Sequence, residues 1–90
     1  MVAGKGMVRM ETRVAVIGII VEEQNSAEKV NAVLHDHSRA IIGRMGIPYR
    51  ERNISIISVA VDATQDDISA LCGKLGRISG VSVKAAYAKN

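Results

Sequence analysis

Two apolar runs, residues 40–47 and 54–61, follow one another directly in the middle of the 90-residue chain. Both runs are short and rich in Ile and Val. The segment between them contains the only proline, Pro48, followed by the polar stretch 49–53. Short β-branched runs on either side of a polar connection are typical of a β-hairpin. We therefore predict a hairpin here, and it is the only direct connection between two predicted strands.

Residues 14–21, VAVIGIIV, form the first predicted strand, and both of its faces are apolar. A sheet that is covered by helices on one side only should alternate apolar and polar residues along each strand. The strand 54–61 repeats the pattern, because its second face is uncharged and carries Ile54, Ile56, Ser58 and Ala60. These patterns predict that the second sheet face is also covered, by another subunit if the chain has no more helices.

A first helix is predicted over residues 26–37, where apolar side chains recur at helical spacing. Asn25 can cap its first turn, and Glu28 three residues later completes a capping-box pair. Ser26 is the alternative cap.

The second predicted helix begins after Thr64, which forms a capping box with Asp67. Its apolar side chains make one stripe with the spacing of a helix face: Ile68, Leu71, Cys72 and Leu75. We expect Gly76 to end this helix in the left-handed conformation. Gly80 then turns the chain into a last strand, residues 81–87, which has one apolar face.

The predicted element order is therefore β-α-β-β-α-β. Right-handed crossovers place both helices on one face of a four-stranded antiparallel sheet, with the first and third strands in the centre. This is an α+β fold, the ferredoxin-like βαββαβ sandwich. Because the other face has no helix, we predict a homo-oligomer, a homodimer or homotetramer, that buries this face or extends the sheet edge to edge. The alternative is an exposed, mildly apolar face.

The composition indicates one domain with a core built from aliphatic side chains, since Trp and Phe are absent. The formal net charge is +3, and a single cysteine excludes an internal disulfide and agrees with a reducing compartment. No apolar run approaches the roughly 20 residues of a membrane span, and the N-terminus has no secretory apolar region. We predict a cytoplasmic protein with a disordered tail, residues 1–12, and one domain, residues 13–89.

Three side chains on the helices carry metal-binding or nucleophilic chemistry. His35 and His37 resemble a metal site, but residues i and i+2 of a helix point about 200° apart, so the two imidazoles do not easily share one ion. We interpret them as a surface histidine beside a half-buried one and predict no metal site, which leaves a metal sensor as the least favoured hypothesis. Cys72 lies on the apolar stripe of the second helix, which indicates a buried, inert thiol.

The turn between the first strand and the first helix holds the candidate ligand-binding residues: Glu22, Glu23, Gln24, Asn25 and Ser26. In this architecture the turn borders a crevice and offers polar groups beside free helix N–H donors. The two glutamates repel anions, and the turn lacks the glycines of a phosphate cradle, so a nucleotide site is disfavoured. A solvated turn that caps the helix is the other interpretation.

Arg44, Arg50 and Arg52 gather with Tyr49 around the hairpin. RNA-reading sheets of this fold stack bases on exposed strand aromatics, and this sheet offers at most Tyr87. We therefore predict no direct contact with nucleic acid and interpret the arginines as solvated charges at strand ends. The sequence has no Ser/His/Asp constellation, paired carboxylates or metal-ligand cluster, so we predict no catalytic residues, no enzyme activity and no cofactor.

Residues 14–49 and 53–89 together resemble the small family of iron-only hydrogenase system regulators, which are stand-alone ACT-like domains. The resemblance rests on the strand VAVIGIIV and on the strand ISIISVAVDAT that runs into the second helix. It also rests on an R-x-G-x-P-Y segment made of Arg44, Gly46, Pro48 and Tyr49. The similar region covers about residues 13–89 and implies a regulatory domain, without indicating any chemistry.

More distantly, the chain is similar to the C-terminal regulatory domain of the nickel-responsive repressor NikR. That domain is also ACT-like, is tetrameric, and binds nickel through three histidines and a cysteine. An ungapped match brings one ligand position onto His35 and the others onto Gly46, Pro48 and Ile54, whose side chains cannot bind nickel. NikR also has a DNA-binding domain ahead of this one, and the resemblance does not extend to that domain. The resemblance therefore implies neither a nickel site nor direct DNA contact.

Many ACT domains bind amino acids where the first loop meets a neighbouring subunit, often with a glycine that residues 22–26 lack. The resemblance implies a homo-oligomeric, ACT-like regulatory domain that controls or assembles an iron-only hydrogenase system by binding a small effector at a subunit interface. The alternative is a protein-interaction module without a small-molecule ligand, which docks on a protein partner through the sheet edge or the open face.

Overall fold

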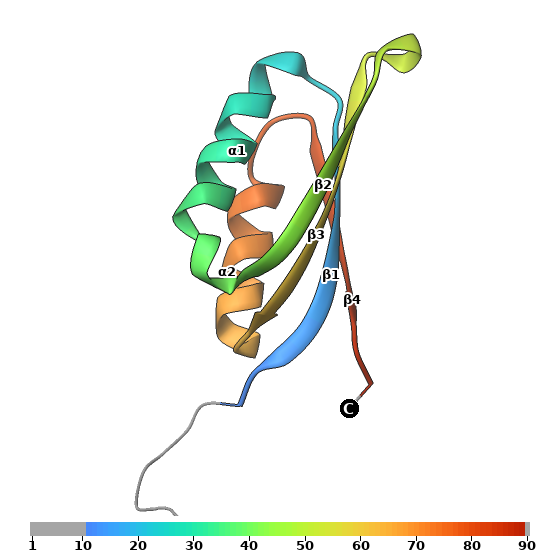
Figure 1. Ribbon diagram of the computed structural model, residues 1–90. Coiled ribbons are helices and arrows are strands. Elements are labelled where there is room, and N and C mark those ends of the chain that lie inside the picture. Colours follow the sequence, from blue (N-terminus) through green and yellow to red (C-terminus); the bar gives the residue numbers. More distant parts are fainter. Residues whose placement is uncertain (1–10, 90) are drawn as a thin grey trace, which may run out of the picture.

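The computed structural model describes residues 11–89, which form two helices packed on one face of an antiparallel sheet (Figure 1). The predicted tail, residues 1–12, falls almost entirely outside this range. The elements are β1 (Arg13–Val21), α1 (Ala27–Asp36), β2 (Ile41–Tyr49), β3 (Ile54–Ala63), α2 (Gln65–Gly76) and β4 (Val81–Tyr87). Short 3-10 turns precede α1, β2 and β3, namely η1 (Gln24–Ser26), η2 (Ser38–Ala40) and η3 (Arg50–Arg52).

The strand order in the sheet is β2-β3-β1-β4, and each neighbouring pair is antiparallel. The first and third strands are thus central, and β2 and β4 are the edges. Both crossovers carry their helix over the same face, where α1 and α2 lie side by side (Figure 1). The predicted ferredoxin-like α+β fold is confirmed.

The core lies between the helices and the inner face of the sheet. Burial alternates along β1, where Ile17 and Ile19 are fully buried and Val16 is 47 % exposed. The helices contribute Val30, Leu34, Ile68, Leu71 and Leu75 to the same core. In the described part of the chain no helix covers the outer face, so three of the seven apolar side chains of β1, those of Val14, Val16 and Ile20, remain exposed.

The start of α1 differs from the predicted capping box. The chain enters the helix through η1, and within residues 11–89 no side chain caps either η1 or α1. Asn25 lies inside the 3-10 turn and is exposed. The hydroxyl of Ser26 is buried and donates instead to the backbone carbonyl oxygen of Ser79 at 2.6 Å. The predicted cap was wrong because Asn25 makes no capping hydrogen bond, and the hydroxyl of Ser26 bonds to the turn before β4 and not to the first turn of α1.

At the two ends of α2, the cap predicted at Thr64 is present and the left-handed end predicted at Gly76 is not. The hydroxyl of Thr64 accepts from the backbone N–H of Asp67 at 3.1 Å, which confirms the predicted cap. Gly76 does not take the left-handed conformation, and the next residue, Arg77, is also right-handed. The backbone reverses only at Gly80, with φ 73°, where the chain turns into β4.

These two helix starts give a matched stability prediction. We expect Thr64→Ala to lower the free energy of unfolding by about 1 kcal/mol, because the first turn of α2 loses its cap. Asn25→Ala should change it by less than about 0.5 kcal/mol, as is usual for an exposed side chain without a specific role. Urea denaturation followed by circular dichroism measures both values. Equal losses in the two variants would contradict the observed capping.

Candidate functional site

The β1–α1 loop, residues 22–26, is tied to the turn between α2 and β4. The backbone N–H of Glu22 donates to the carbonyl oxygen of Gly80 at 2.7 Å. The hydroxyl of Ser79 donates to a carboxylate oxygen of Glu23 at 2.9 Å, and Ser26 donates to Ser79 as described above. Two of the five predicted ligand-binding residues, Glu23 and Ser26, therefore use their polar side-chain groups in holding the fold together.

Gln24 points the other way, towards the hairpin, where its side-chain amide donates to the side-chain oxygen of Asn53. Between this loop and the end of the hairpin lies an open pocket of about 350 Å³. It is lined by Val21, Gln24, Pro48, Tyr49, Arg50, Asn53, Ile54 and Ser55. Of the five predicted ligand-binding residues, Gln24 lines this pocket, whereas Glu22, Glu23, Asn25 and Ser26 do not.

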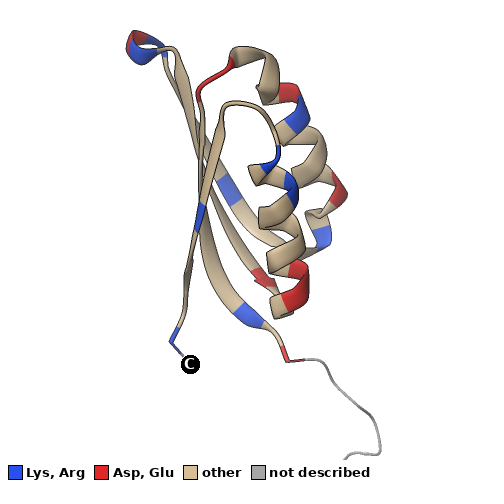
Figure 2. Cartoon of the chain, turned by 180° about the vertical axis from the view of Figure 1, so that it is seen from behind, with Lys and Arg blue, Asp and Glu red and all other residues tan. Residues whose placement is uncertain are grey.

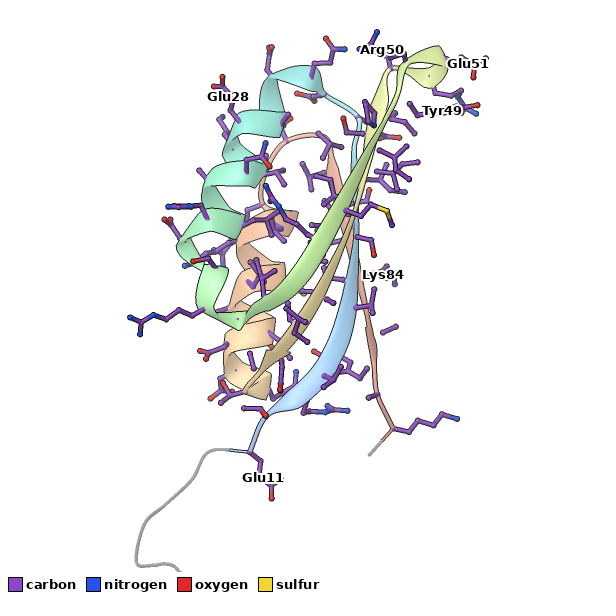
Figure 3. The ribbon with its side chains drawn as sticks, viewed as in Figure 1. Glu11, Glu28, Tyr49, Arg50, Glu51 and Lys84 are labelled. Carbon is purple, nitrogen blue, oxygen red and sulfur yellow. The ribbon has the colours of Figure 1, made fainter. Side chains whose placement is uncertain are left out.

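The shape of the hairpin end explains why these residues meet. After β2 the chain makes the single 3-10 turn η3, and the N–H of Asn53 donates to the carbonyl oxygen of Arg50 at 3.1 Å. Asn53 takes the left-handed conformation, with φ 57°, which asparagine tolerates better than most residues. Figure 3 shows Arg50 and Glu51 at this tip, between the end of β2 and the start of β3. The turn thus brings Arg50 and Asn53 to the pocket.

The pocket combines one cation with neutral polar groups and an apolar wall. Arg50 is the charged residue in its lining, and Gln24, Asn53, Tyr49 and Ser55 supply amide and hydroxyl groups. An arginine beside amide donors suits a small anionic group such as a carboxylate. The lining contains no histidine, cysteine or carboxylate, the groups that commonly activate a nucleophile.

Sequence reasoning missed most of this lining. It interpreted Arg50 as a solvated charge at a strand end and placed the candidate site in residues 22–26 alone. Arg50 is exposed at the strand end, as interpreted, and it also lines the pocket, while Arg44 lines a separate hollow that it shares with His35. The signal available in the sequence was Pro48 and Asn53 on either side of a short polar segment, since both residue types are typical of turns.

The two histidines lie in different places. His35 lines the hollow beside Arg44, whereas His37 lines a hollow near the start of α2. The ammonium nitrogen of Lys74 lies 3.1 Å from Nε2 of His37, so a cation already occupies the neighbourhood of that nitrogen. In residues 11–89 no three His, Cys, Asp or Glu side chains are grouped so that they could hold a metal ion.

Cys72 is half-buried on α2 and packs against the core. Desolvation by this burial raises the pKa of its thiol above the ordinary value, so the uncharged form prevails at neutral pH. Because the thiolate is the reactive form, the environment suits the predicted structural role.

The exposed aromatic of the sheet is Tyr49, which corrects the prediction for Tyr87. Tyr87 pairs with Ala15 on the inner face, where Gln65 donates to its hydroxyl at 2.9 Å and the guanidinium of Arg13 lies 4.2 Å from its ring. Tyr49 is 41 % exposed and points away from the helices (Figure 3). Side chains alternate between the two faces along β4, so Tyr87 lies on the same face as Val81, Val83 and Ala85, which pack against the core.

Residues 13–85 match a protein family described as "TM1266-like: Iron-only hydrogenase system regulator, putative". The chain belongs to this family. A solved structure, that of the uncharacterized protein TM1266 from Thermotoga maritima, is similar to the chain with 41 % sequence identity and a TM-score of 0.84. The alignment covers 88 % of this chain and 100 % of that chain. No curated protein matches the chain.

Membership of the TM1266-like family confirms the resemblance that the strand and hairpin motifs indicated, and it supports a regulatory role. The match spans β1 to most of β4, so it includes the pocket lining and both helices. Among the described residues, no helix has the length and apolar character needed to cross a bilayer.

Proposed function

We propose that this member of the TM1266-like family is a non-catalytic regulatory domain that acts as a homo-oligomer and binds a small effector. The pocket beside Arg50 is the binding site, and the observation that carries the proposal is its composition. One guanidinium, two side-chain amides and an apolar wall meet in a space of about 350 Å³, without a nucleophile and its base. The effector class that fits is a small carboxylic acid with an apolar part, such as an amino acid.

The position of the pocket supports binding at a subunit interface. Tyr49 and Ile54 line the pocket and also pair with each other at the end of the outer sheet face. A second copy that covered this face would border the pocket on that side. The effector would then contact both subunits. It would bind one arrangement of the oligomer more tightly than another and so shift the equilibrium towards that arrangement. The system that is regulated, that of the iron-only hydrogenase, follows from the family description.

The test is a thermal-unfolding screen against amino acids, small carboxylic acids, nucleotides and divalent metals. A ligand at 100 times its dissociation constant adds about 2.7 kcal/mol to the free energy of unfolding. For a domain of this size the melting temperature should rise by roughly 10–20 °C. Arg50→Gln should abolish the rise, whereas Arg52→Gln should retain it, because Arg52 lies in the same turn but outside the pocket lining.

Two outcomes of the screen contradict effector binding at this pocket. A rise that survives in Arg50→Gln places the site elsewhere. Silence across the panel favours a second candidate function, an interaction module that binds a protein partner without a small molecule. The exposed apolar outer face is the observation that favours this second candidate.

A further inference from the structure

The outer face of the sheet exposes seven large apolar side chains. They are 38 to 63 % exposed: Val14, Val16, Ile20, Met45, Ile47, Tyr49 and Ile56. If a fully exposed large side chain has an area of about 150–250 Å², these exposed fractions correspond to roughly 600 Å² of apolar surface in total. That value is at the upper end for the largest patch of a monomeric protein. With the smaller residues between them, the face approaches the roughly 800 Å² that each partner buries in a stable dimer.

The face is a better contact than either edge of the sheet. The edge strand β2 contains Pro48, which has no N–H to donate, and its ladder is irregular between Ile41 and Gly43. The other edge strand, β4, carries Lys84 near its middle. Prolines, irregularities and lysines are the devices that prevent strands from pairing edge to edge. Charged residues gather instead on the helices and at the hairpin tip, while the sheet carries few (Figure 2).

The strand register arranges the outer face in rows across the sheet. The middle row runs from β2 to β4 through Met45, Ser58, Gly18 and Lys84. Its prominent residue is Met45, 63 % exposed, and its low point is Gly18, where an apolar hollow of about 250 Å³ lies between Ile20, Ile56 and Lys84. The protruding side chain and the hollow lie on opposite sides of Ser58.

We propose that a second copy of this chain packs face to face on this surface, around a two-fold axis that runs along β3 and passes over Ser58. This places Met45 of each copy in the hollow above Gly18 of the other. The neighbouring rows then also match, with Ile47 opposite Ile20 and Gly43 opposite Val16. A two-fold interface requires such reciprocal pairs. The inference rests on the homo-oligomer of the proposed function and specifies its contact surface.

The Gly18 hollow favours this axis over one that crosses the strands at the same row. The proposed axis fills the hollow and places β4 at the rim of the contact, so the ammonium group of Lys84, on the outer side of the sheet in Figure 3, can still reach water. It brings the exposed Asp62 of each copy opposite the other, but Asp62 is the second-last residue of β3 and lies at the margin of the face, where water screens the two charges. An axis across the strands would bring the two Lys84 side chains together in the middle row and leave both Gly18 hollows empty, and both effects weaken the centre of an interface.

The experiment combines the mass in solution with one distance. Light scattering at tens of micromolar should give at least two copies. A spin label is then attached at Lys84→Cys in a Cys72→Ser background. Strand spacings of about 4.8 Å and a sheet separation of about 10 Å place the two labelled backbones roughly 20 Å apart. A monomer overturns both this inference and the homo-oligomer. A separation of about 10 Å between the labelled backbones would indicate the axis across the strands, and one of about 34 Å would indicate edge-to-edge pairing through β2. Either value in an oligomer overturns only the arrangement around β3.

A pair of substitutions tests the Met45–Gly18 contact. A Cβ at Gly18 would meet its nearest heavy atom at an ordinary contact distance of 3.8 Å, and the position borders the open hollow, so we expect a single chain with Gly18→Val to fold as the parent does. It fills the hollow, and we expect the dissociation constant of the dimer to rise at least tenfold. Adding Met45→Ala in the same chain should recover part of this loss, since the smaller side chain no longer needs the hollow. Unchanged association in Gly18→Val, or a further loss in the double variant, overturns the contact.

Discussion

Gly80→Ala should lower the free energy of unfolding by about 2–4 kcal/mol, from backbone strain and steric overlap together. Gly80 has φ 73°, and a Cβ there would lie 2.6 Å from Cγ and 3.0 Å from Cβ of Glu23. Those atoms are near the backbone of Glu23, so the side chain cannot simply rotate away. The melting temperature should fall by roughly 10–25 °C, measured by circular dichroism. The β1–α1 loop would lose its close approach to the turn before β4.

Two variants separate the causes of that loss. Gly73→Ala, in the middle of α2, meets no heavy atom within 4 Å and should stabilise the protein by about 0.5–1 kcal/mol. Glu23→Ala combined with Gly80→Ala removes most of the steric overlap and should recover part of the stability, leaving the cost of the left-handed backbone. If Gly80→Ala and Gly73→Ala behave alike, the close contact between Glu23 and Gly80 is wrong.

Ile17→Ala should destabilise the protein by about 2–5 kcal/mol, because the deleted side chain leaves a cavity in the core. Ile17 is fully buried in the central strand, between both helices and the neighbouring strands. Small domains are stable by only about 5–15 kcal/mol in total, so a variant at the upper end would be partly unfolded at room temperature. Urea denaturation gives the change as a lower midpoint with an unchanged slope.

Val14→Ala is the matched control on the outer face of the same strand. Val14 is 46 % exposed near the start of β1, and its truncation should lower the free energy of unfolding by less than about 1 kcal/mol. The difference between the two losses measures how much more the buried inner face of β1 contributes to stability than its exposed outer face. Equal losses at Ile17 and Val14 would mean that the inner and outer faces of β1 are not distinguished as the fold requires.

Local patterns were enough to predict the fold. The hairpin, the two helical periods and the right-handed crossover rule yield the strand order β2-β3-β1-β4 without any long-range information. The cap of α2 was also predictable, because Thr64 and Asp67 are three residues apart and interact within one turn. The crossover rule also puts Val16 and Ile20 on a face without helices, and the second subunit that their apolar character predicts over this face stays a prediction.

The candidate site depended on contacts between residues far apart in the chain. Glu23 and Ser26 were predicted to face a ligand, yet Ser79 takes the hydrogen bonds of both. Gln24 reaches the pocket because Asn53 turns the hairpin end towards it. Hydrogen-bonding groups of a loop satisfy whichever partners the fold brings near, and periodicity carries no information about those partners. Sequence patterns therefore determined the layers of this protein, and packing between distant turns determined which polar groups remain for binding.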